Sequence, residues 1–271
     1  MKSLLQNLSG EALLDEFFEE LSRKRERFLL LDYDGTLAPF REDRDNAYPR
    51  EGFAEIIDAI IAERKVTVAI ISGRSIADLR RLLGFVELPE LWGTHGLERL
   101  SADGNYSMSK LDPEVEARLS TALDDLCNSF DTRRIEQKPG SVAFHVRGLP
   151  PMQAETSLRE IRERWQPLTH GRRLVISNFD GGIELRATGS DKGRVVCEIL
   201  SRASGDFSAV YMGDDFTDED AFIVIKNKGL SVLVREIYRP TNADLWLKPE
   251  GEMLEFLRRY YQTIREVCDE R

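Results

Sequence analysis

The chain has 271 residues, of which 41% are hydrophobic and 32% are charged, and this is the composition of a folded globular protein rather than of a disordered one. Its formal net charge of −10 opposes binding to nucleic acids and acidic membranes, because both present negatively charged phosphates. No stretch reaches the ~18 apolar residues of a membrane span, and the N-terminus lacks the apolar segment of a secretion signal. We therefore expect a cytoplasmic monomer whose partner is a small molecule.

The N-terminal part of the chain predicts a helix followed by strands that end in polar residues. Leucine and phenylalanine recur at three- and four-residue intervals within residues 1–25, which favours an amphipathic helix packed on the body of the protein. The apolar runs FLLLD (28–32), VTVAIIS (66–72) and FSAVYMGDD (207–215) then read as buried parallel strands. Ligands of open parallel sheets lie beyond the carboxyl ends of the strands, so these polar ends are expected to meet at one site.

The two ends and the middle of the chain differ in pattern. At both ends strands alternate with helices throughout, and further strands at 230–234 and 243–247 precede a closing helix at about 251–267. The middle instead contains adjacent strand pairs, which indicate an inserted α+β domain. Its expected helices lie at about 113–130 and 151–166, and its expected strands at 134–138, 141–147, 173–177 and 182–186.

These patterns predict an α/β protein with a Rossmann-like core and a cap. The core has a parallel sheet flanked by helices and comprises residues 1–106 and 188–271. The cap comprises residues 107–187 and is expected to lie above the carboxyl ends of the core strands. Such an arrangement would enclose a small substrate.

The segment DYDGTL (32–37) places two carboxylates where a buried strand breaks into a loop at Gly35. Asp32 could attack phosphorus to form an acyl phosphate, while Asp34 protonates the leaving oxygen and later deprotonates water. Acidic pairs in loops are common, so this motif gains weight only from its surroundings.

The segment GDDFTDED (213–220) supplies further carboxylates after another buried strand. Hard oxygen ligands of this kind suit Mg²⁺, which takes one or two carboxylates and keeps several waters. Asp32, Asp214 and the backbone carbonyl of Asp34 would suffice, leaving Asp215 and Asp218 to orient the ligands. Capping of a helix N-terminus is the alternative role of these acids.

Two further residues complete a site for a phosphate group. Ser72 follows the strand at 66–72, where its hydroxyl and nearby backbone N–H groups can hold phosphate oxygens. Lys192 begins an expected helix and can offset the charge of the phosphoryl group and of Asp32. Ser72 alone would read as an ordinary helix N-cap, and Lys192 alone as a surface lysine.

The order of these pieces resembles the haloacid dehalogenase superfamily of phosphatases, and the resemblance covers almost the whole chain. It implies that Asp32 is the nucleophile, Asp34 the general acid and base, Ser72 and Lys192 phosphate-binding residues, and Asp214 a magnesium ligand.

A finer resemblance joins GTHGLE (93–98), IEQKPGSVAFHVR (135–147), GIELR (182–186) and GDDFTDE (213–219) to the trehalose-6-phosphate phosphatases. It implies that cap residues hold the sugar and that further residues at matching motif positions contact the substrate. The implied sugar-holding residues are Glu136, Lys138 and Glu184, and the further positions are Arg74, His95, His145 and Arg147. The segment ELRATGSDKG lacks the proline that family members commonly carry before the motif lysine, so the loop between cap and core differs.

Several alternatives stay open at this stage. The substrate could be another glycosyl phosphate, such as glucosylglycerol phosphate, a mannosyl phosphoglycerate or sucrose 6-phosphate. A mutase could return the phosphoryl group to a sugar. A signalling receiver that stores phosphate, or a sugar-phosphate binder without catalysis, would use some of the same residues. His145 could simply pack or face water, and Glu136 with Lys138 could form an exposed ion pair of little energetic weight.

Overall fold

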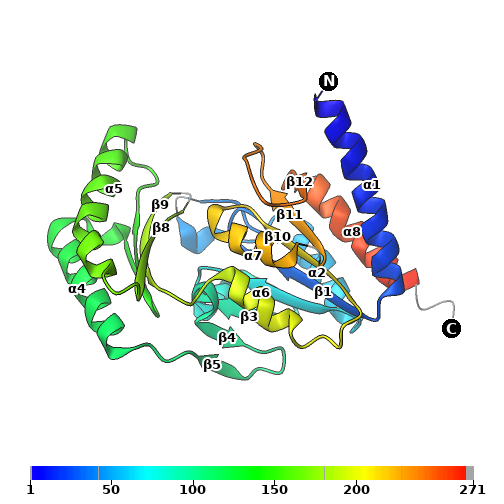
Figure 1. Ribbon diagram of the computed structural model, residues 1–271, viewed down its shortest axis with the longest axis horizontal. Coiled ribbons are helices and arrows are strands. Elements are labelled where there is room, and N and C mark those ends of the chain that lie inside the picture. The colour runs from blue at the N-terminus through cyan, green and yellow to red at the C-terminus, as the bar shows by residue number, and fades with distance from the viewer. Residues whose placement is uncertain (1, 42, 180, 227, 267–271) are drawn as a thin grey trace.

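The computed structural model describes residues 2–41, 43–179, 181–226 and 228–266, with side chains from residue 10 onward. It has two parts, a larger body that contains both ends of the chain and a smaller part formed by the middle of the chain (Figure 1). None of the described helices is long and apolar enough to cross a membrane. The cytoplasmic location and the monomeric state stay predictions.

Within the described residues the larger body is built on a sheet of eight strands in the order β12-β11-β10-β1-β2-β3-β4-β5. Neighbours from β12 to β3 are parallel, whereas β4 and β5 are antiparallel to their neighbours. The bounds are β1 Glu26–Leu31, β2 Thr67–Ile71, β3 Glu90–Gly93, β4 Glu98–Leu100, β5 Tyr106–Met108, β10 Phe207–Gly213, β11 Leu230–Val234 and β12 Leu245–Leu247.

Helices cover both faces of this sheet. Successive side chains of a strand point to opposite faces, so Leu29 and Leu31 of β1 join one apolar cluster while Phe28 and Leu30 join the other. The helices of the first cluster are α1 Lys2–Arg23, α2 Phe53–Ala62, α3 Ile76–Leu82 and α8 Glu252–Glu266, and those of the second are α6 Lys192–Leu200 and α7 Glu219–Ile225. Burial on both faces explains why these strands are continuous apolar runs.

The middle of the chain forms the cap, an antiparallel sheet in the order β6-β7-β9-β8. Its elements are α4 Pro113–Ser129, β6 Ile135–Lys138, β7 Ser141–His145, α5 Pro151–Trp165, β8 Leu174–Phe179 and β9 Gly182–Ala187. Val142, Phe144, Ile183 and Leu185 pack with the two helices in a third apolar cluster. The alternation of strand side chains therefore turns the polar positions between them toward the other face of this sheet.

The predicted fold class is confirmed, as are most of its elements. The expected runs after residue 28 correspond to β1, β2, β10, β11 and β12, and those of the middle to α4, β6, β7, α5, β8 and β9. The expectation that strands and helices alternate throughout both ends was wrong, because β3, β4 and β5 follow one another without an intervening α-helix. The closing helix is described as far as Glu266, and residue 267 lies outside the described residues. The predicted boundary at 107 lies inside β5, so the domain limits stay a prediction.

Candidate active site

Asp32 and Asp34 lie where β1 ends in the middle of the sheet. Asp32 is 3% exposed, and its backbone N–H donates to the carbonyl of Met212 at the end of β10. Gly35 then turns the chain with a φ of 82°, and a Cβ atom at this position would lie 2.2 Å from Oδ2 of Asp214. The turn therefore requires glycine, because a side chain would collide with the neighbouring acid.

Lys192, the first residue of α6, connects the two acidic strand ends. Its Nζ donates to Oδ1 of Asp32 at 2.6 Å and to Oδ1 of Asp218 at 2.8 Å. Asp218 is fully buried and also accepts hydrogen bonds from the Tyr211 hydroxyl at 2.5 Å and from the backbone N–H groups of Asp214 and Asp215. The Asp218 carboxylate thus accepts hydrogen bonds from the lysine, the tyrosine and the loop after β10, and it thereby fixes the positions of the lysine and the loop.

Burial perturbs the titration of these groups. Loss of hydration raises the pKa of Asp32 to about 7, although Lys192 opposes the shift. Burial likewise holds the pKa of Asp214 well above its usual range, and the neighbouring carboxylates add to this effect. Burial alone would lower the pKa of Lys192, but Asp218 and Asp32 outweigh it and raise the value. Full ionisation of Asp32, Asp214 and Asp218 would therefore place more negative charge here than Lys192 alone balances.

The donor set fits a hard cation. One carboxylate oxygen from each of Asp32, Asp214 and Asp218 lies within 4.8 Å of the others. Both oxygens of Asp214 are buried and accept no hydrogen bond from the described residues, and Arg235 Nη1 lies 3.8 Å from Oδ2. Because Asp218 is already engaged, Asp32 and Asp214 are the carboxylates with capacity left for a metal such as Mg²⁺.

Ser72 and Arg74 follow β2 on the adjacent side of the site. Ser72 is 1% exposed, and its hydroxyl accepts a hydrogen bond from the backbone N–H of Arg74 at 3.1 Å. The Arg74 guanidinium donates from Nε and Nη2 to the two carboxylate oxygens of Asp34, each at 2.7 Å. This bidentate pair fixes the orientation of Asp34.

Glu184 is bound from both sides of the boundary between cap and core. Its carboxylate contacts Nζ of Lys138 at 2.8 Å and accepts from the Ser141 hydroxyl at 2.8 Å within the cap. The ring of His95, which belongs to the core, lies 3.0 Å away through Nε2. Burial alone would raise the pKa of Glu184, but Lys138 and His95 bring it well below its usual range, while burial lowers the pKa of His95.

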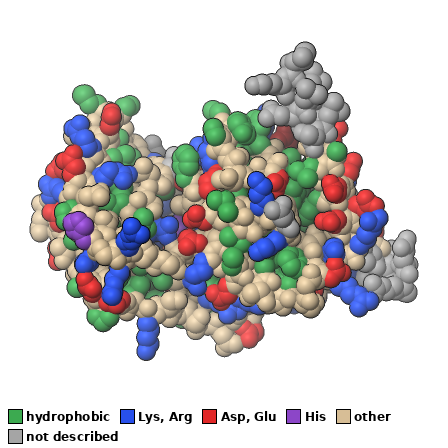
Figure 2. All heavy atoms as spheres, viewed as in Figure 1, with side chains coloured by type: hydrophobic (Ala, Val, Ile, Leu, Met, Phe, Trp, Pro, Cys, Tyr) green, Lys and Arg blue, Asp and Glu red, His purple; other side chains and the backbone are tan. Residues whose placement is uncertain are grey.

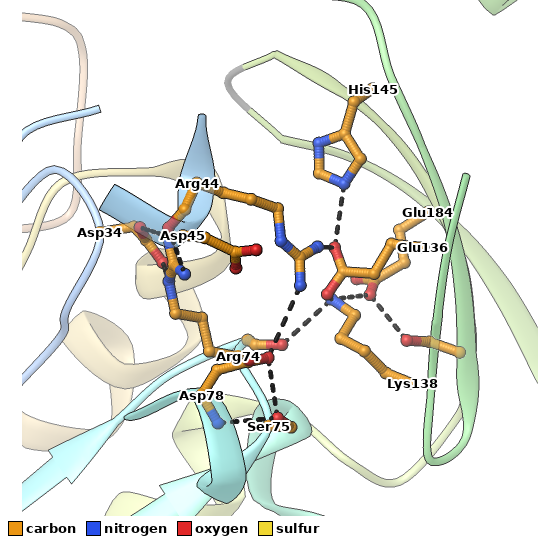
Figure 3. A network of polar contacts seen from close by, with 12 residues as sticks. Asp34, Arg44, Asp45, Arg74, Ser75, Asp78, Glu136, Lys138, His145 and Glu184 are labelled. Atoms are coloured by element: carbon orange, nitrogen blue, oxygen red, sulfur yellow. Dashed lines mark hydrogen bonds and ion pairs between the residues drawn. The ribbon is translucent and has the colours of Figure 1, made fainter. Parts of the chain in front are cut away.

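Other cap residues also approach the core. Lys138 Nζ donates to the backbone carbonyl of Gly73 at 3.0 Å. Glu136 Oε2 lies 2.9 Å from Nε2 of His145, and the Arg147 guanidinium stacks over the core residue Phe40 at 4.2 Å from the ring centre. The cap side chains thus meet the core loops in a polar interface, part of which Figure 3 shows.

A cavity of about 1090 Å³ lies between cap and core, and the surface is hollowed between the two parts (Figure 2). Every residue predicted from sequence lines this cavity except Asp218, which lies behind it. The lining set includes Asp32, Asp34, Ser72, Arg74, His95, Glu136, Lys138, His145, Arg147, Glu184, Lys192, Asp214 and Asp215. A cavity lined by cations and acids from both the core and the cap suits a hydrophilic ligand that carries a charged group.

Tyr211 and Arg44 are among the residues around the site that had no sequence prediction. Tyr211 lies within the apolar run before Asp214 and reads there as a core aromatic. In the structure it belongs to the apolar cluster that β10 shares with α6, the helix that begins with Lys192. Arg44 lies in a polar loop without a motif, and nothing in the sequence singles it out. Conversely, Glu136 and Lys138 do not form the exposed pair that the sequence left open, because their side chains are 12% and 10% exposed.

Solved structures share this fold. The C-terminal domain of a Candida albicans trehalose-6-phosphate phosphatase aligns with a TM-score of 0.80 and 19% identity, covering 92% of this chain and 96% of that one. A haloacid dehalogenase-like hydrolase from Bacteroides thetaiotaomicron aligns with a TM-score of 0.60 and 16% identity, covering 86% and 99%. These likenesses show that the chain has the fold of the haloacid dehalogenase-like hydrolases.

Sequence comparison identifies the family to which the chain belongs within this fold. The trehalose-phosphatase family profile matches residues 30–249, so the chain belongs to this family of phosphoric monoester hydrolases. It is 30% identical to a probable trehalose-phosphate phosphatase D of Arabidopsis thaliana, covering 94% of this chain and 72% of that protein. It is 29% identical to a trehalose-phosphate phosphatase of Mycobacterium tuberculosis, covering 90% and 63%. The chain thus spans about two thirds of the length of these curated relatives.

Proposed function

We propose that this protein hydrolyses trehalose 6-phosphate to trehalose and inorganic phosphate, in a magnesium-dependent reaction through an acyl phosphate on Asp32. The observation that carries the proposal is one cavity in which the strand-end acids face polar residues of the cap. The names of the curated relatives support the choice of substrate. Because the protein is a phosphoric monoester hydrolase, the receiver and the non-catalytic binder are set aside.

The proposed reaction has two steps. A carboxylate oxygen of Asp32 bonds to phosphorus as the bond from phosphorus to the sugar oxygen breaks, and Asp34 gives its proton to that oxygen. Asp34 then takes a proton from water, whose oxygen bonds to phosphorus as the bond to Asp32 breaks. Phosphate and sugar leave, and both acids return to their initial states. Arg74, bound to both oxygens of Asp34, would hold the acid in place.

The phosphoryl group would be held by residues of the core. Asp32, Asp214 and the backbone carbonyl of Asp34 would hold Mg²⁺, which when bound would neutralise charge on the phosphoryl oxygens. Ser72 would donate its hydroxyl to one phosphoryl oxygen, and Lys192 would offset the charge that develops during transfer. Asp215 and Asp218 would orient these groups without contacting the metal.

The sugar would be held by residues of the cap, which we assign to 107–187, with the catalytic core at 1–106 and 188–271. Carboxylates accept hydrogen bonds from sugar hydroxyls and a lysine donates to them, so Glu136, Lys138 and Glu184 can read several hydroxyls in fixed orientations. His145 lies beside Glu136, and His95 beside Glu184. Arg147 borders the same cavity from the cap.

The test is phosphate release by purified protein with Mg²⁺ from trehalose 6-phosphate, glucose 6-phosphate, sucrose 6-phosphate and glucosylglycerol phosphate. A clear preference for trehalose 6-phosphate supports the proposed substrate, and turnover without an added sugar bisphosphate separates a hydrolase from a mutase. Turnover confined to another ester would overturn the sugar assignment while leaving the roles of Asp32 and Asp34 intact. Activity that is unchanged by chelation of Mg²⁺ would contradict the metal assignment.

A further inference from the structure

Arg44 crosses the boundary between core and cap with its side chain. It begins the short helix η1 (Arg44–Asn46) of the core, and its Nη1 pairs with Oε2 of Glu136 on β6 of the cap. Its Nη2 lies 3.5 Å from Oδ2 of Asp78 on α3 of the core. Figure 3 shows the guanidinium between these two carboxylates. One cation thus has one partner on each side of the boundary.

The backbone of the same residue leads to the catalytic acid. The carbonyl oxygen of Arg44 accepts a hydrogen bond from Nη1 of Arg74 at 2.8 Å, and the other donors of that guanidinium hold Asp34. The Arg74 side chain is 8% exposed, so it has little freedom to take another position. A continuous series of contacts therefore runs from Glu136 through Arg44 and Arg74 to Asp34.

Glu136 has capacity for a further ligand while Arg44 holds it. Its Oε2 contacts Arg44 and His145, whereas Lys138 Nζ is 4.0 Å from Oε1. An ionised carboxylate has about four acceptor positions, so a sugar hydroxyl can still donate to it. Without Arg44 the remaining partners of Glu136 among these contacts belong to the cap. The core would then lose its side-chain link to this carboxylate.

We propose that Arg44 is a positioning residue whose side chain docks the cap against the core next to the catalytic acid. Its guanidinium holds Glu136 against the core when the cap is closed, and Asp78 is its partner on the core when the cap moves away. Its carbonyl meanwhile holds Arg74 against Asp34. This inference rests on the proposed function, because it assigns Arg44 to the same sugar-phosphate site. Phosphate esters whose leaving group reaches Glu136 should depend on Arg44, and small esters should not.

Arg81 provides a matched control. Its Nη2 pairs with Asp45 at 2.7 Å and with Asp78 at 3.2 Å, and both partners belong to the core. Arg81→Met therefore removes the same charge as Arg44→Met, from the same neighbourhood and next to the same Asp78. The ion pair with the cap stays intact in this control.

The first experiment measures kcat/KM for trehalose 6-phosphate and for p-nitrophenyl phosphate, a small ester without sugar hydroxyls. We expect Arg44→Met to lower the value for the sugar phosphate by at least about tenfold and the value for p-nitrophenyl phosphate by less than about twofold. In a Glu136→Gln background the same change should cost less than about twofold. Arg81→Met should alter neither substrate. Equal losses on both esters, no loss, or the full loss in the Glu136→Gln background would each overturn the proposal.

The second experiment does not depend on activity. Amide hydrogen exchange of β6 and β7 is followed by mass spectrometry in the ligand-free wild type, Arg44→Met and Arg81→Met. Faster exchange in Arg44→Met alone supports the link to the cap, and unchanged exchange in that variant overturns it. If the wild type hydrolyses another sugar phosphate instead, trehalose 6-phosphate is wrong as the substrate. The Arg44 and Arg81 variants are then compared on that other ester. If it hydrolyses none, exchange alone decides the role of Arg44.

Discussion

Asp218 is the residue at which the buried charges of the site meet. Its Oδ1 accepts from both Lys192 and Tyr211, and its Oδ2 accepts from the backbone N–H groups that follow β10. A buried carboxylate is tolerated only when such donors compensate for its lost hydration. Asp218 thereby fixes Lys192, which in turn contacts Asp32. The proposed nucleophile is thus oriented by a residue that does not line the cavity.

Tyr211→Phe tests this indirect support. Removing the hydroxyl takes one donor from a buried carboxylate, a loss of about 1.5–3 kcal/mol in unfolding free energy, and leaves Lys192 less constrained. We expect kcat to fall about tenfold with little change in KM. Tyr260→Phe is the control, because the buried hydroxyl of Tyr260 has no hydrogen-bond partner among the described residues. Equal kcat values in the two variants would show that the Tyr211 hydroxyl does not support the site.

Burial raises the pKa of Asp32 to about 7 and also raises the pKa of Asp214. These shifts predict how stabilisation by Mg²⁺ depends on pH. An acid whose pKa is higher in the folded state stabilises the metal-free fold at low pH, and this contribution is lost as pH rises through the folded-state value. Mg²⁺ binds the ionised acids and releases protons, so it should raise Tm more at about pH 8 than at about pH 6. Its apparent affinity should fall by up to about tenfold per pH unit below the Asp32 pKa for each displaced proton.

Thermal denaturation with and without Mg²⁺ checks this expectation. In Asp32→Asn the share of this pH dependence that comes from Asp32 should disappear, because asparagine carries no titrating proton, and only the share from Asp214 should remain. An effect of Mg²⁺ on Tm that is the same at both pH values in the wild type would contradict the assigned ligands.

At the scale of elements, the end of β1 determines where the acids lie. The strand runs through the middle of the sheet between β2 and β10, and the left-handed turn at Gly35 brings its loop against Asp214. The proposed metal ligand Asp214 therefore occupies the space that a side chain at position 35 would need. The end of β1 and the loop after β10 are therefore in close contact, and a change in one must move the other.

Gly35→Ala should disrupt this contact. The new Cβ would lie 2.2 Å from Oδ2 of Asp214, so the loop or the acid must move, and we expect activity and Mg²⁺ binding to fall at least about a hundredfold. Gly84→Ala is the control, since Gly84 also has a positive φ but a Cβ atom added there would meet nothing within 4 Å. It should cost about 1–2 kcal/mol of stability and leave activity unchanged. Retained Mg²⁺ binding in Gly35→Ala would contradict the proposed arrangement.

The strands that end in acids could be predicted because both faces of the sheet bury them, which leaves an unbroken apolar run in the sequence. The segment β3–β5 could not, because its strands are short and two of them carry a buried acid, Glu90 of β3 and Glu98 of β4. Glu90 of β3 is 6% exposed and is compensated by Arg99 and Arg202, partners that tertiary structure alone brings together. Local pattern is a weak signal where long-range ion pairs replace apolar contacts.

At the scale of the molecule, the cap has an apolar cluster of its own that is separate from the two clusters of the core. Trp165 at the end of α5 is completely buried in this cluster. Each part is thus held together chiefly by contacts within itself, whereas polar pairs such as His95 with Glu184 join the two. Motion of the cap as a rigid body is the expected consequence.

Trp165→Ala tests the independence of the cap. We expect a loss of about 3–5 kcal/mol that is confined to the cap, seen as faster amide exchange in α4, α5 and β8 but not in β1 or β10. Met152→Ala on the same helix is the control, because Met152 is 81% exposed. Accelerated exchange in β1 and β10 to the same extent would show that cap and core unfold as one unit.

Sequence reasoning found the core acids because each follows a recognisable strand, and the geometry brings Asp32, Ser72, Lys192 and Asp214 to one cavity. It found the polar cap positions through a family resemblance rather than through periodicity. It did not find Arg44, because the contact of this residue with Glu136 forms only when the cap lies against the core. Contacts between distant segments of the chain leave no periodic signal.

The role of Asp32 can be tested directly by trapping the proposed acyl phosphate. Asp34→Asn should slow its hydrolysis but also removes the proposed general acid, so we would use p-nitrophenyl phosphate, whose leaving group needs no proton from Asp34. The variant is mixed with this ester and Mg²⁺, quenched with acid, reduced with borohydride and analysed as peptides by mass spectrometry. We expect conversion of residue 32 to homoserine, the reduction product of an aspartyl phosphate. Conversion at Asp214 or another acid, or nitrophenol release from this variant without any trapped residue, would contradict Asp32 as the nucleophile.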